Sequence, residues 1–144
     1  MSAAPSCILR TPLIYLPLMK DKSEIDALKQ VLEAYRKKGK VLLAYLYGSW
    51  AKGLQHKRSD IDLAVYIDPS DEKEAIEITD AILMTSEIPV EILRLDDGDE
   101  SPFIVQEALK GIPLVDPDMD TLYRVAHRAL HDCESIRFRR AMRH

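Results

Sequence analysis

An uncharged apolar run from Val41 to Tyr47 ends abruptly at the pair Gly48-Ser49, and this boundary constrains the fold more than any other feature of the sequence. A continuous apolar run of this length is typical of a β-strand that is buried on both faces. Gly48 has no Cβ, so another group can approach its backbone closely, and Ser49 can cap a short helix near Trp50 to Lys52, whose first N–H groups point outward. The sequence therefore predicts a strand that leads into a turn suited to a phosphate group.

Two aspartates lie at the start of the next predicted strand. Asp60 and Asp62 begin a run in which every odd-numbered position is aliphatic: Ile61, Leu63, Val65 and Ile67. This period of two predicts a half-buried strand with both carboxylates on one face. Residues two apart in a strand are separated by about 6.6 Å, so the two carboxylates can converge on one or two divalent cations between them. A phosphate turn beside a pair of metal-binding carboxylates implies a nucleoside triphosphate.

Three polar residues between the turn and the aspartates are further candidates for contact with the triphosphate. Lys52 ends the predicted short helix, and Arg58 and Ser59 lie in the polar loop from Gln55 to Ser59. We predict that all three bind the nucleotide, because cationic side chains and hydroxyl groups donate hydrogen bonds to phosphate oxygens. For Lys52 and Arg58 the alternative is an ordinary solvated surface side chain.

Two amphipathic helices are predicted beside these strands. Ser23 to Asp26 has the form of a capping box and predicts the start of a helix that closes at Gly39. After Asp68-Pro69, Ser70 is expected to cap the second helix. The resulting order of helix, strand, turn, strand, helix and strand predicts an α/β domain with a small mixed sheet.

Taken together, these residues resemble a known signature. Gly48-Ser49, ten residues and then Asp60-x-Asp62 resembles the signature of the polymerase-beta-like nucleotidyltransferase superfamily. The sequence G-S-W-A-K-G…R-S-D-I-D-L-A-V is similar to those of the smallest members of this superfamily, the minimal nucleotidyltransferase (MNT, MntA-type) antitoxins that partner HEPN toxins. The resemblance covers roughly Val41 to Leu95. It implies an α/β (α+β) fold in which helices pack on one face of a small mixed sheet and the site is open at the other.

A third carboxylate, usually an aspartate, completes the metal site in the family that the chain resembles. Val90 to Leu95 follows Pro89 and predicts a third strand, in which Glu91 is the one acidic residue. The resemblance therefore implies that Glu91 is the third metal ligand, although a glutamate departs from the family pattern. The alternative is a half-exposed strand glutamate that holds no metal.

The resemblance also implies a reaction. Asp60, Asp62 and Glu91 would be the catalytic residues and would bind Mg²⁺, with two ions expected, and ATP would be the co-substrate. AMP would be transferred to a tyrosine of a cognate HEPN ribonuclease toxin, which this would inactivate. Two alternatives remain open: a catalytically silent antitoxin that masks the toxin by binding, and a small-molecule nucleotidyltransferase of the aminoglycoside type. The absence of an obvious acceptor domain in so short a chain disfavours the small-molecule enzyme.

The 144 residues are predicted to form a single nucleotidyltransferase domain. Within it, residues 1–19 are predicted to be an N-terminal arm and residues 118–144 a basic C-terminal helix. The apolar segment from Ile8 to Met19 is broken by Pro12 and Pro17 and is too short to span a bilayer, and two cysteines are too few for a disulfide framework. We therefore expect a cytoplasmic protein that does not associate with membranes.

Charge is distributed unevenly, although the net charge is only −4. Between Asp68 and Glu100 there are twelve acidic residues against two basic ones, whereas Asp120 to His144 contains six arginines and three acidic residues. One interpretation is a solvated acidic surface and a basic helix face; the other is that the arginine-rich end meets an acidic partner, a nucleic acid or a triphosphate. We expect a HEPN-type toxin as the partner, in a hetero-oligomer, and no direct binding of nucleic acid.

Overall fold

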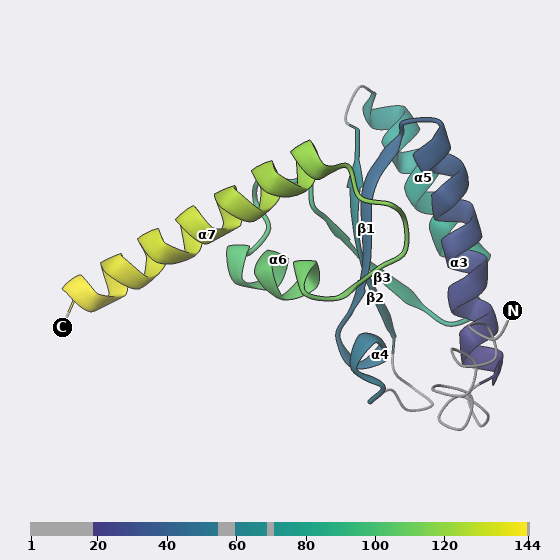
Figure 1. Ribbon diagram of the computed structural model, residues 1–144, viewed down its shortest axis with the longest axis horizontal. Coiled ribbons are helices and arrows are strands. Elements are labelled where there is room, and N and C mark those ends of the chain that lie inside the picture. The colour runs from purple at the N-terminus through teal and green to yellow at the C-terminus, as the bar shows by residue number, and fades with distance from the viewer. Residues whose placement is uncertain (1–18, 55–59, 69–70, 144) are drawn as a thin grey trace, which may run out of the picture.

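The computed structural model describes residues 19–54, 60–68 and 71–143. Its helices and strands can be followed along the chain in Figure 1. In order they are α3 (Met19–Lys37), β1 (Val41–Tyr47), α4 (Ser49–Lys52), β2 (Ile61–Ile67), α5 (Glu72–Thr85), β3 (Val90–Arg94), α6 (Pro102–Leu109), β4 (Ile112–Pro113) and α7 (Met119–Met142). The predicted arm, apart from Met19, lies outside the described residues, as do Arg58 and Ser59.

The four strands form one mixed sheet in the order β3-β2-β1-β4. β1 pairs antiparallel with both β2 and β4, whereas β2 and β3 are parallel. Parallel neighbours need a crossover connection, and α5 supplies it between β2 and β3. The predicted small mixed sheet and the polymerase-beta-like fold class are confirmed.

β1 is buried on both faces, as its apolar sequence predicts. Val41, Ala44 and Leu46 belong to one core cluster, and Leu43 and Tyr45 belong to the other. A register shift between Val41 and Leu43 lets these two residues face opposite sides, although they are two positions apart. One strand therefore connects both halves of the hydrophobic core.

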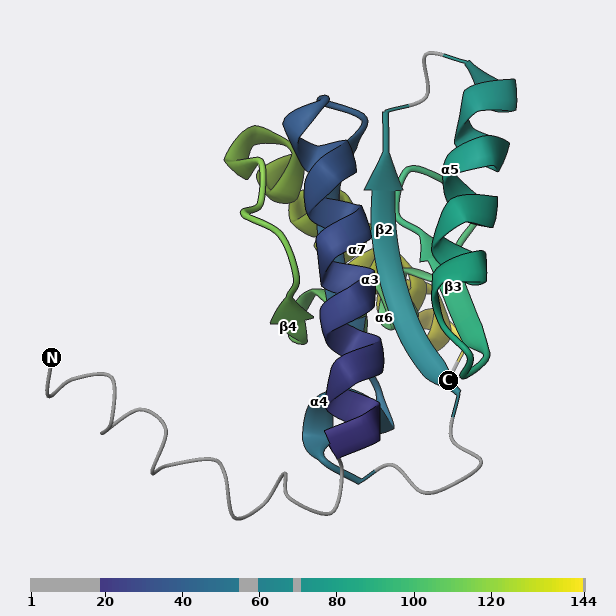
Figure 2. The ribbon, with the colours of Figure 1, turned by 90° about the vertical axis from the view of Figure 1, so that its right-hand side faces the viewer.

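The sheet carries helices on both faces, so the expectation of helices on one face is corrected. α3 and α5 cover one face through residues such as Leu32 and Ile82, and Figure 2 shows them side by side in front of the strands. α6 and the first part of α7 cover part of the other face through Val105, Ala108 and Ala129. Both faces of β1 carry buried apolar side chains, so covering a single face of the sheet would leave the other set in water.

Two helix starts differ from the sequence prediction. α3 begins at Met19, so Ser23 lies within the helix instead of capping it. α5 is capped by Asp71, whose carboxylate accepts a hydrogen bond from the backbone N–H of Lys73 at 3.1 Å. The other end of α3 agrees with the prediction, because Gly39 has a positive φ of 73° and donates to the carbonyl of Arg36.

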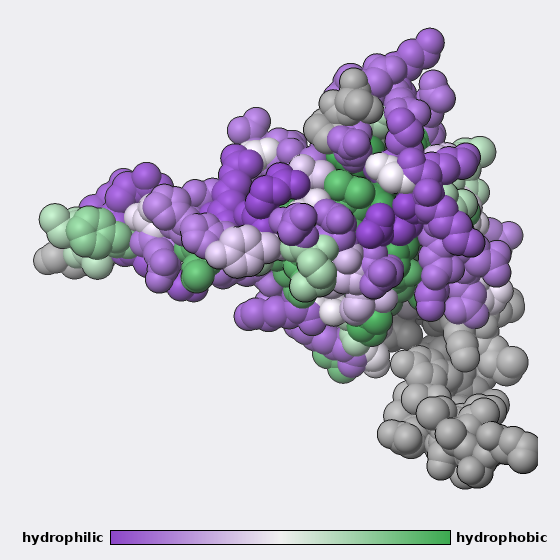
Figure 3. Space-filling model, turned by 45° about the horizontal axis from the view of Figure 1, so that its top comes forward, coloured by the Kyte–Doolittle hydropathy of each residue, from purple (hydrophilic) through white to green (hydrophobic). Residues whose placement is uncertain are grey.

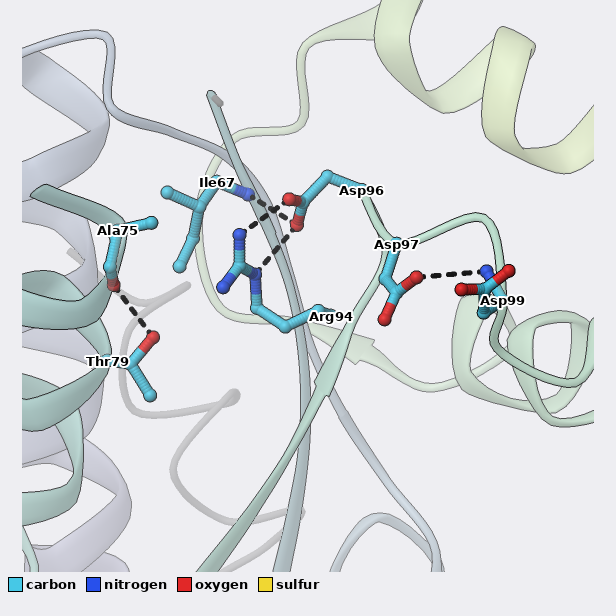
Figure 4. A network of polar contacts seen from close by, with 7 residues as sticks. All are labelled: Ile67, Ala75, Thr79, Arg94, Asp96, Asp97 and Asp99. Carbon is cyan, nitrogen blue, oxygen red and sulfur yellow. Dashed lines mark hydrogen bonds and ion pairs between the residues drawn. The ribbon is translucent and has the colours of Figure 1, made fainter. Parts of the chain in front are cut away.

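An acidic loop joins β3 to α6. At the start of this loop Arg94 forms a bidentate ion pair with Asp96 (Figure 4). Its Nε is 2.9 Å from Oδ1 and its Nη2 is 2.6 Å from Oδ2 of Asp96. The Asp96 carboxylate also accepts from the backbone N–H of Ile67, and the Asp97 carboxylate accepts from the N–H of Asp99. The bond from Ile67 holds the loop against the end of β2, and the other contacts stabilise the loop itself.

The predicted basic helix at the C-terminus is present as α7. Its N-cap is Asp118, whose carboxylate accepts from both the backbone N–H and the hydroxyl of Thr121, at 3.1 and 2.6 Å. These two bonds hold the pKa of the Asp118 carboxyl below its usual value. None of the helices in the described parts of the chain combines the length and the apolar character that crossing a bilayer requires.

Candidate active site

The predicted phosphate turn lies at the end of β1. Gly48 has φ 74° and ψ −150°, a backbone conformation that is almost exclusive to glycine, and it occupies the N-cap position of α4. Ser49 is the first residue of the helix, so the prediction that Ser49 is the cap is wrong. Trp50 is buried in the core and anchors this short helix to the sheet.

The carboxylates predicted to bind metal lie beside this turn. In the sheet Asp62 is paired with Tyr47 on β1 and with Glu91 on β3, so these three side chains share the face that α6 and α7 partly cover. Asp60 is two residues before Asp62, and β1 ends where β2 and β3 begin. Strand pairing thus brings the turn and all three predicted ligands to one end of the sheet.

Gly48 and Asp62 are in direct contact. A Cβ at residue 48 would collide with a carboxylate oxygen of Asp62. Gly48 therefore has two independent reasons to be glycine, its backbone conformation and the space that the Asp62 carboxylate occupies. The Gly48-Ser49 turn and the aspartate motif are separated in sequence but are in contact in space, because β1 and β2 are antiparallel neighbours.

The charges at this end of the sheet perturb two side chains. Burial, followed by the negative charges of Glu91 and Asp60, raises the pKa of the Asp62 carboxyl. Burial also raises the pKa of Tyr47 to about 12, and Asp62, Glu91 and Glu100 add to this effect. The carboxylates repel one another, so a bound cation would relieve their repulsion.

The donor set fits Mg²⁺, although not in the side-chain positions of this structure. Carboxylate oxygens are the ligands that Mg²⁺ prefers, and Asp60 and Glu91 are exposed and have room to turn. As the side chains stand, no three His, Cys, Asp or Glu residues within the described chain converge closely enough to surround one ion. To surround one ion beside Asp62, Asp60 and Glu91 would have to change rotamer.

Lys52, predicted to contact the nucleotide, points toward α6. Its Nζ is 3.5 Å from Oε2 of Glu107, and both side chains are more than half exposed. An exposed pair of this kind contributes little to stability, so Lys52 can leave Glu107 at small cost. Its contact with a triphosphate stays a prediction.

Tyr47 is the residue that the sequence analysis missed. The sequence pattern identifies it only as the last member of an apolar strand, yet in the sheet it is the register partner of Asp62. The signal was present in part, because Tyr47 immediately precedes the Gly48-Ser49 turn. Only the register between β1 and β2 identifies its neighbour.

Comparison with known proteins agrees with this fold. The polymerase beta nucleotidyltransferase family matches residues 28–120, which is more than half of the chain. The chain therefore belongs to the polymerase beta nucleotidyltransferase family. No curated protein sequence matches it.

Solved structures that resemble the chain include toxin–antitoxin complexes. A toxin–antitoxin complex with AMP-PNP matches with a TM-score of 0.60 and 22% identity, covering 79% of this chain and 93% of that chain. A MntA–HepT complex matches with a TM-score of 0.57 and 18% identity, covering 84% and 93%. A tri-AMPylated Shewanella oneidensis HEPN toxin in complex with its MNT antitoxin matches with a TM-score of 0.53 and 20% identity, covering 79% and 93%. The resemblance to MNT antitoxins is thus confirmed, and at these identities it establishes the fold.

Proposed function

We propose that this chain is a Mg²⁺-dependent antitoxin that transfers AMP from ATP to a tyrosine of a HEPN-type ribonuclease toxin. The modification would place bulk and negative charge on the toxin and so block its access to RNA. The chain's membership of the nucleotidyltransferase family supports the reaction class. Its similarity to antitoxins in complexes with HEPN toxins supports the choice of acceptor.

One observation carries the proposal: Asp62 contacts the Gly48 turn and is paired with Glu91 on the next strand. A transferase that uses a nucleoside triphosphate needs its phosphate-binding backbone and its metal-binding carboxylates within the length of one triphosphate. Here they are neighbours. A protein that only masked its partner would have no physical need for this arrangement.

In the proposed reaction, the tyrosine oxygen of the acceptor bonds to the α-phosphorus of ATP while the bond to the bridging oxygen of pyrophosphate breaks. The hydroxyl proton leaves to solvent, and pyrophosphate carries away the electron pair of the broken bond. Mg²⁺ held by Asp60, Asp62 and Glu91 would neutralise phosphate charge and make the acceptor hydroxyl more acidic. The chain's own contribution is to hold the triphosphate at the Gly48-Ser49 turn, with Lys52 within reach of its charge.

The test uses purified chain, labelled ATP and Mg²⁺, together with the HEPN-type protein encoded by the neighbouring gene. Intact-protein mass spectrometry should show the acceptor gaining one or more AMP units. Asp60→Asn should abolish the gain, because it removes a metal-binding charge from an exposed position that contributes no core packing. Asp68→Asn is the matched control, since Asp68 is an exposed aspartate at the other end of β2 and should leave transfer unchanged.

Two results would contradict the proposal in different ways. If the acceptor's mass never changes while its ribonuclease activity falls equally with wild-type chain and Asp60→Asn, the chain works by masking its partner. If labelled AMP appears on a small molecule instead, the chain belongs to the aminoglycoside-type alternative.

A further inference from the structure

The C-terminal end of α7 extends beyond the body of the protein. Thr121, Ala129 and Cys133 are the buried residues of this helix, and every residue from 137 to 143 is exposed. Figure 1 shows the helix continuing away from the sheet past α6. Most helical stability comes from packing an apolar face, so a projecting end of two turns gains little from this fold.

A row of large apolar side chains runs from the packed part of α7 into its projecting end. Leu130, Phe138 and Met142 lie on one row of residues four apart, in which Glu134 is the polar member. Phe138 is 65% exposed and Met142 is 72% exposed. In Figure 3 hydrophobic surface is visible at the tip of the projecting arm, with hydrophilic surface around it. Such a row matches the spacing by which an amphipathic helix fills an apolar groove of another protein.

Four arginines surround this row. Arg137, Arg139, Arg140 and Arg143 occur after the last acidic residue, Glu134. Arg137 and Arg140 lie over the ring of Phe103, and none of the four forms an ion pair with an acidic residue of the described chain. Basic residues suit a helix C-terminus, yet the helix dipole does not account for an apolar row among them.

We propose that residues 130–143 form a docking helix that places its apolar row in a groove of the acceptor protein, with carboxylates on the rim of that groove meeting the arginines. The identity of the partner rests on the proposed function. The geometry suits delivery of an acceptor, because α7 packs on the face of the sheet that carries Asp62 and Glu91. A partner held along α7 would face the same side as the carboxylates.

A nucleic acid fits this surface less well. The depression beside the docking helix is lined by Asp99 and Glu100 of the acidic loop as well as by Arg139. Carboxylates at that position repel a phosphate backbone, and the chain as a whole is negatively charged. A protein partner can place its acidic groups beside the arginines and its apolar side chains against Phe138.

The experiment measures binding of the full chain to the HEPN-type protein encoded by the neighbouring gene, by titration calorimetry without ATP and Mg²⁺. Phe138→Ala with Met142→Ala should raise the dissociation constant about 100-fold, since each of two buried anchors contributes about tenfold to the affinity. Alanine preserves the helix. The matched control is Ile76→Ala with Met84→Ala on α5, which are 53% and 85% exposed, also lie on one helix, and should bind as wild type.

Each outcome separates docking from transfer. Unchanged affinity in the Phe138 and Met142 double variant, or an equal loss in the Ile76 and Met84 control, overturns the docking inference. Wild-type chain that binds a fluorescent single-stranded RNA more tightly than the HEPN-type protein, with loss of RNA binding on Arg139→Gln and Arg143→Gln, also overturns it. Strong binding that the double variant loses, without any AMP transfer by wild-type chain, supports docking and contradicts only the proposed function.

Discussion

Replacing Gly48 with alanine should reduce both stability and AMP transfer, for reasons that can be separated by experiment. The backbone of Gly48 lies at φ 74° and ψ −150°, a region that other residues adopt at a cost of up to about 3 kcal/mol. The added Cβ would also collide with the Asp62 carboxylate. The carboxylate would have to move away from the turn, so the variant should lose the contact between phosphate site and metal ligand.

The chain offers two matched controls. Gly39 and Gly53 also have positive φ, 73° and 71°, but a Cβ at either position meets no atom within 4 Å among the described residues. Alanine at each should cost about 1–2 kcal/mol of unfolding free energy from backbone strain alone. Gly48→Ala should therefore cost about 3 kcal/mol and should also impair catalysis, whereas the two controls should leave catalysis intact. A domain of this size is stable by about 5–15 kcal/mol, so all three variants should remain folded.

The assays are urea denaturation and AMP transfer to the HEPN-type acceptor. The double variant Gly48→Ala with Asp62→Ala isolates the collision, because truncating Asp62 removes the carboxylate that the new Cβ would meet. The two substitutions should be coupled by about 1 kcal/mol, with the double variant less destabilised than the sum of the single variants. Additive losses, or a Gly48→Ala variant no less stable than Gly53→Ala with normal transfer, would refute the steric argument.

Further predictions concern the same end of the sheet. Folding raises the pKa of Asp62, so the contribution of this carboxyl to stability is present at acidic pH and is lost as the pH rises through the raised pKa. In metal-free buffer at neutral pH, Asp62→Asn should therefore have a higher melting temperature than wild type, and thermal melts should show the difference shrinking toward acidic pH. Because the pKa of Tyr47 is raised to about 12, the wild-type chain should lose stability between about pH 10 and 12. Over that range the urea concentration at the unfolding midpoint should fall less for Tyr47→Phe than for wild type, whereas Tyr123→Phe, at an exposed site, should behave as wild type. Glu91→Gln should raise the Mg²⁺ concentration required for half-maximal transfer about tenfold, and wild-type behaviour would exclude it as a ligand. Ser49→Ala should raise the KM for ATP with little loss of stability, since Gly48 and not Ser49 holds the cap position; a lower melting temperature with unchanged kinetics would make Ser49 structural.

Much of the candidate site was predictable because its signals are local in sequence. The apolar run that ends at Gly48 predicted β1 and the turn, and the alternation after Asp60 predicted β2 with its carboxylates on one face. Strand β3 with Glu91 followed from the same kind of pattern. These properties depend on side-chain size, polarity and backbone freedom at single positions, which the sequence states directly.

The tertiary structure decided what those elements face. Tyr47 meets Asp62, and Asp62 meets Glu91, only because strand pairing sets one register among several that the patterns allow. The helices on both faces follow from the two apolar sides of β1, and α6 and α7 cover the second side from far along the chain. Local preferences of about 1 kcal/mol per position fix the elements, whereas burial of whole faces, worth many times more, fixes their arrangement.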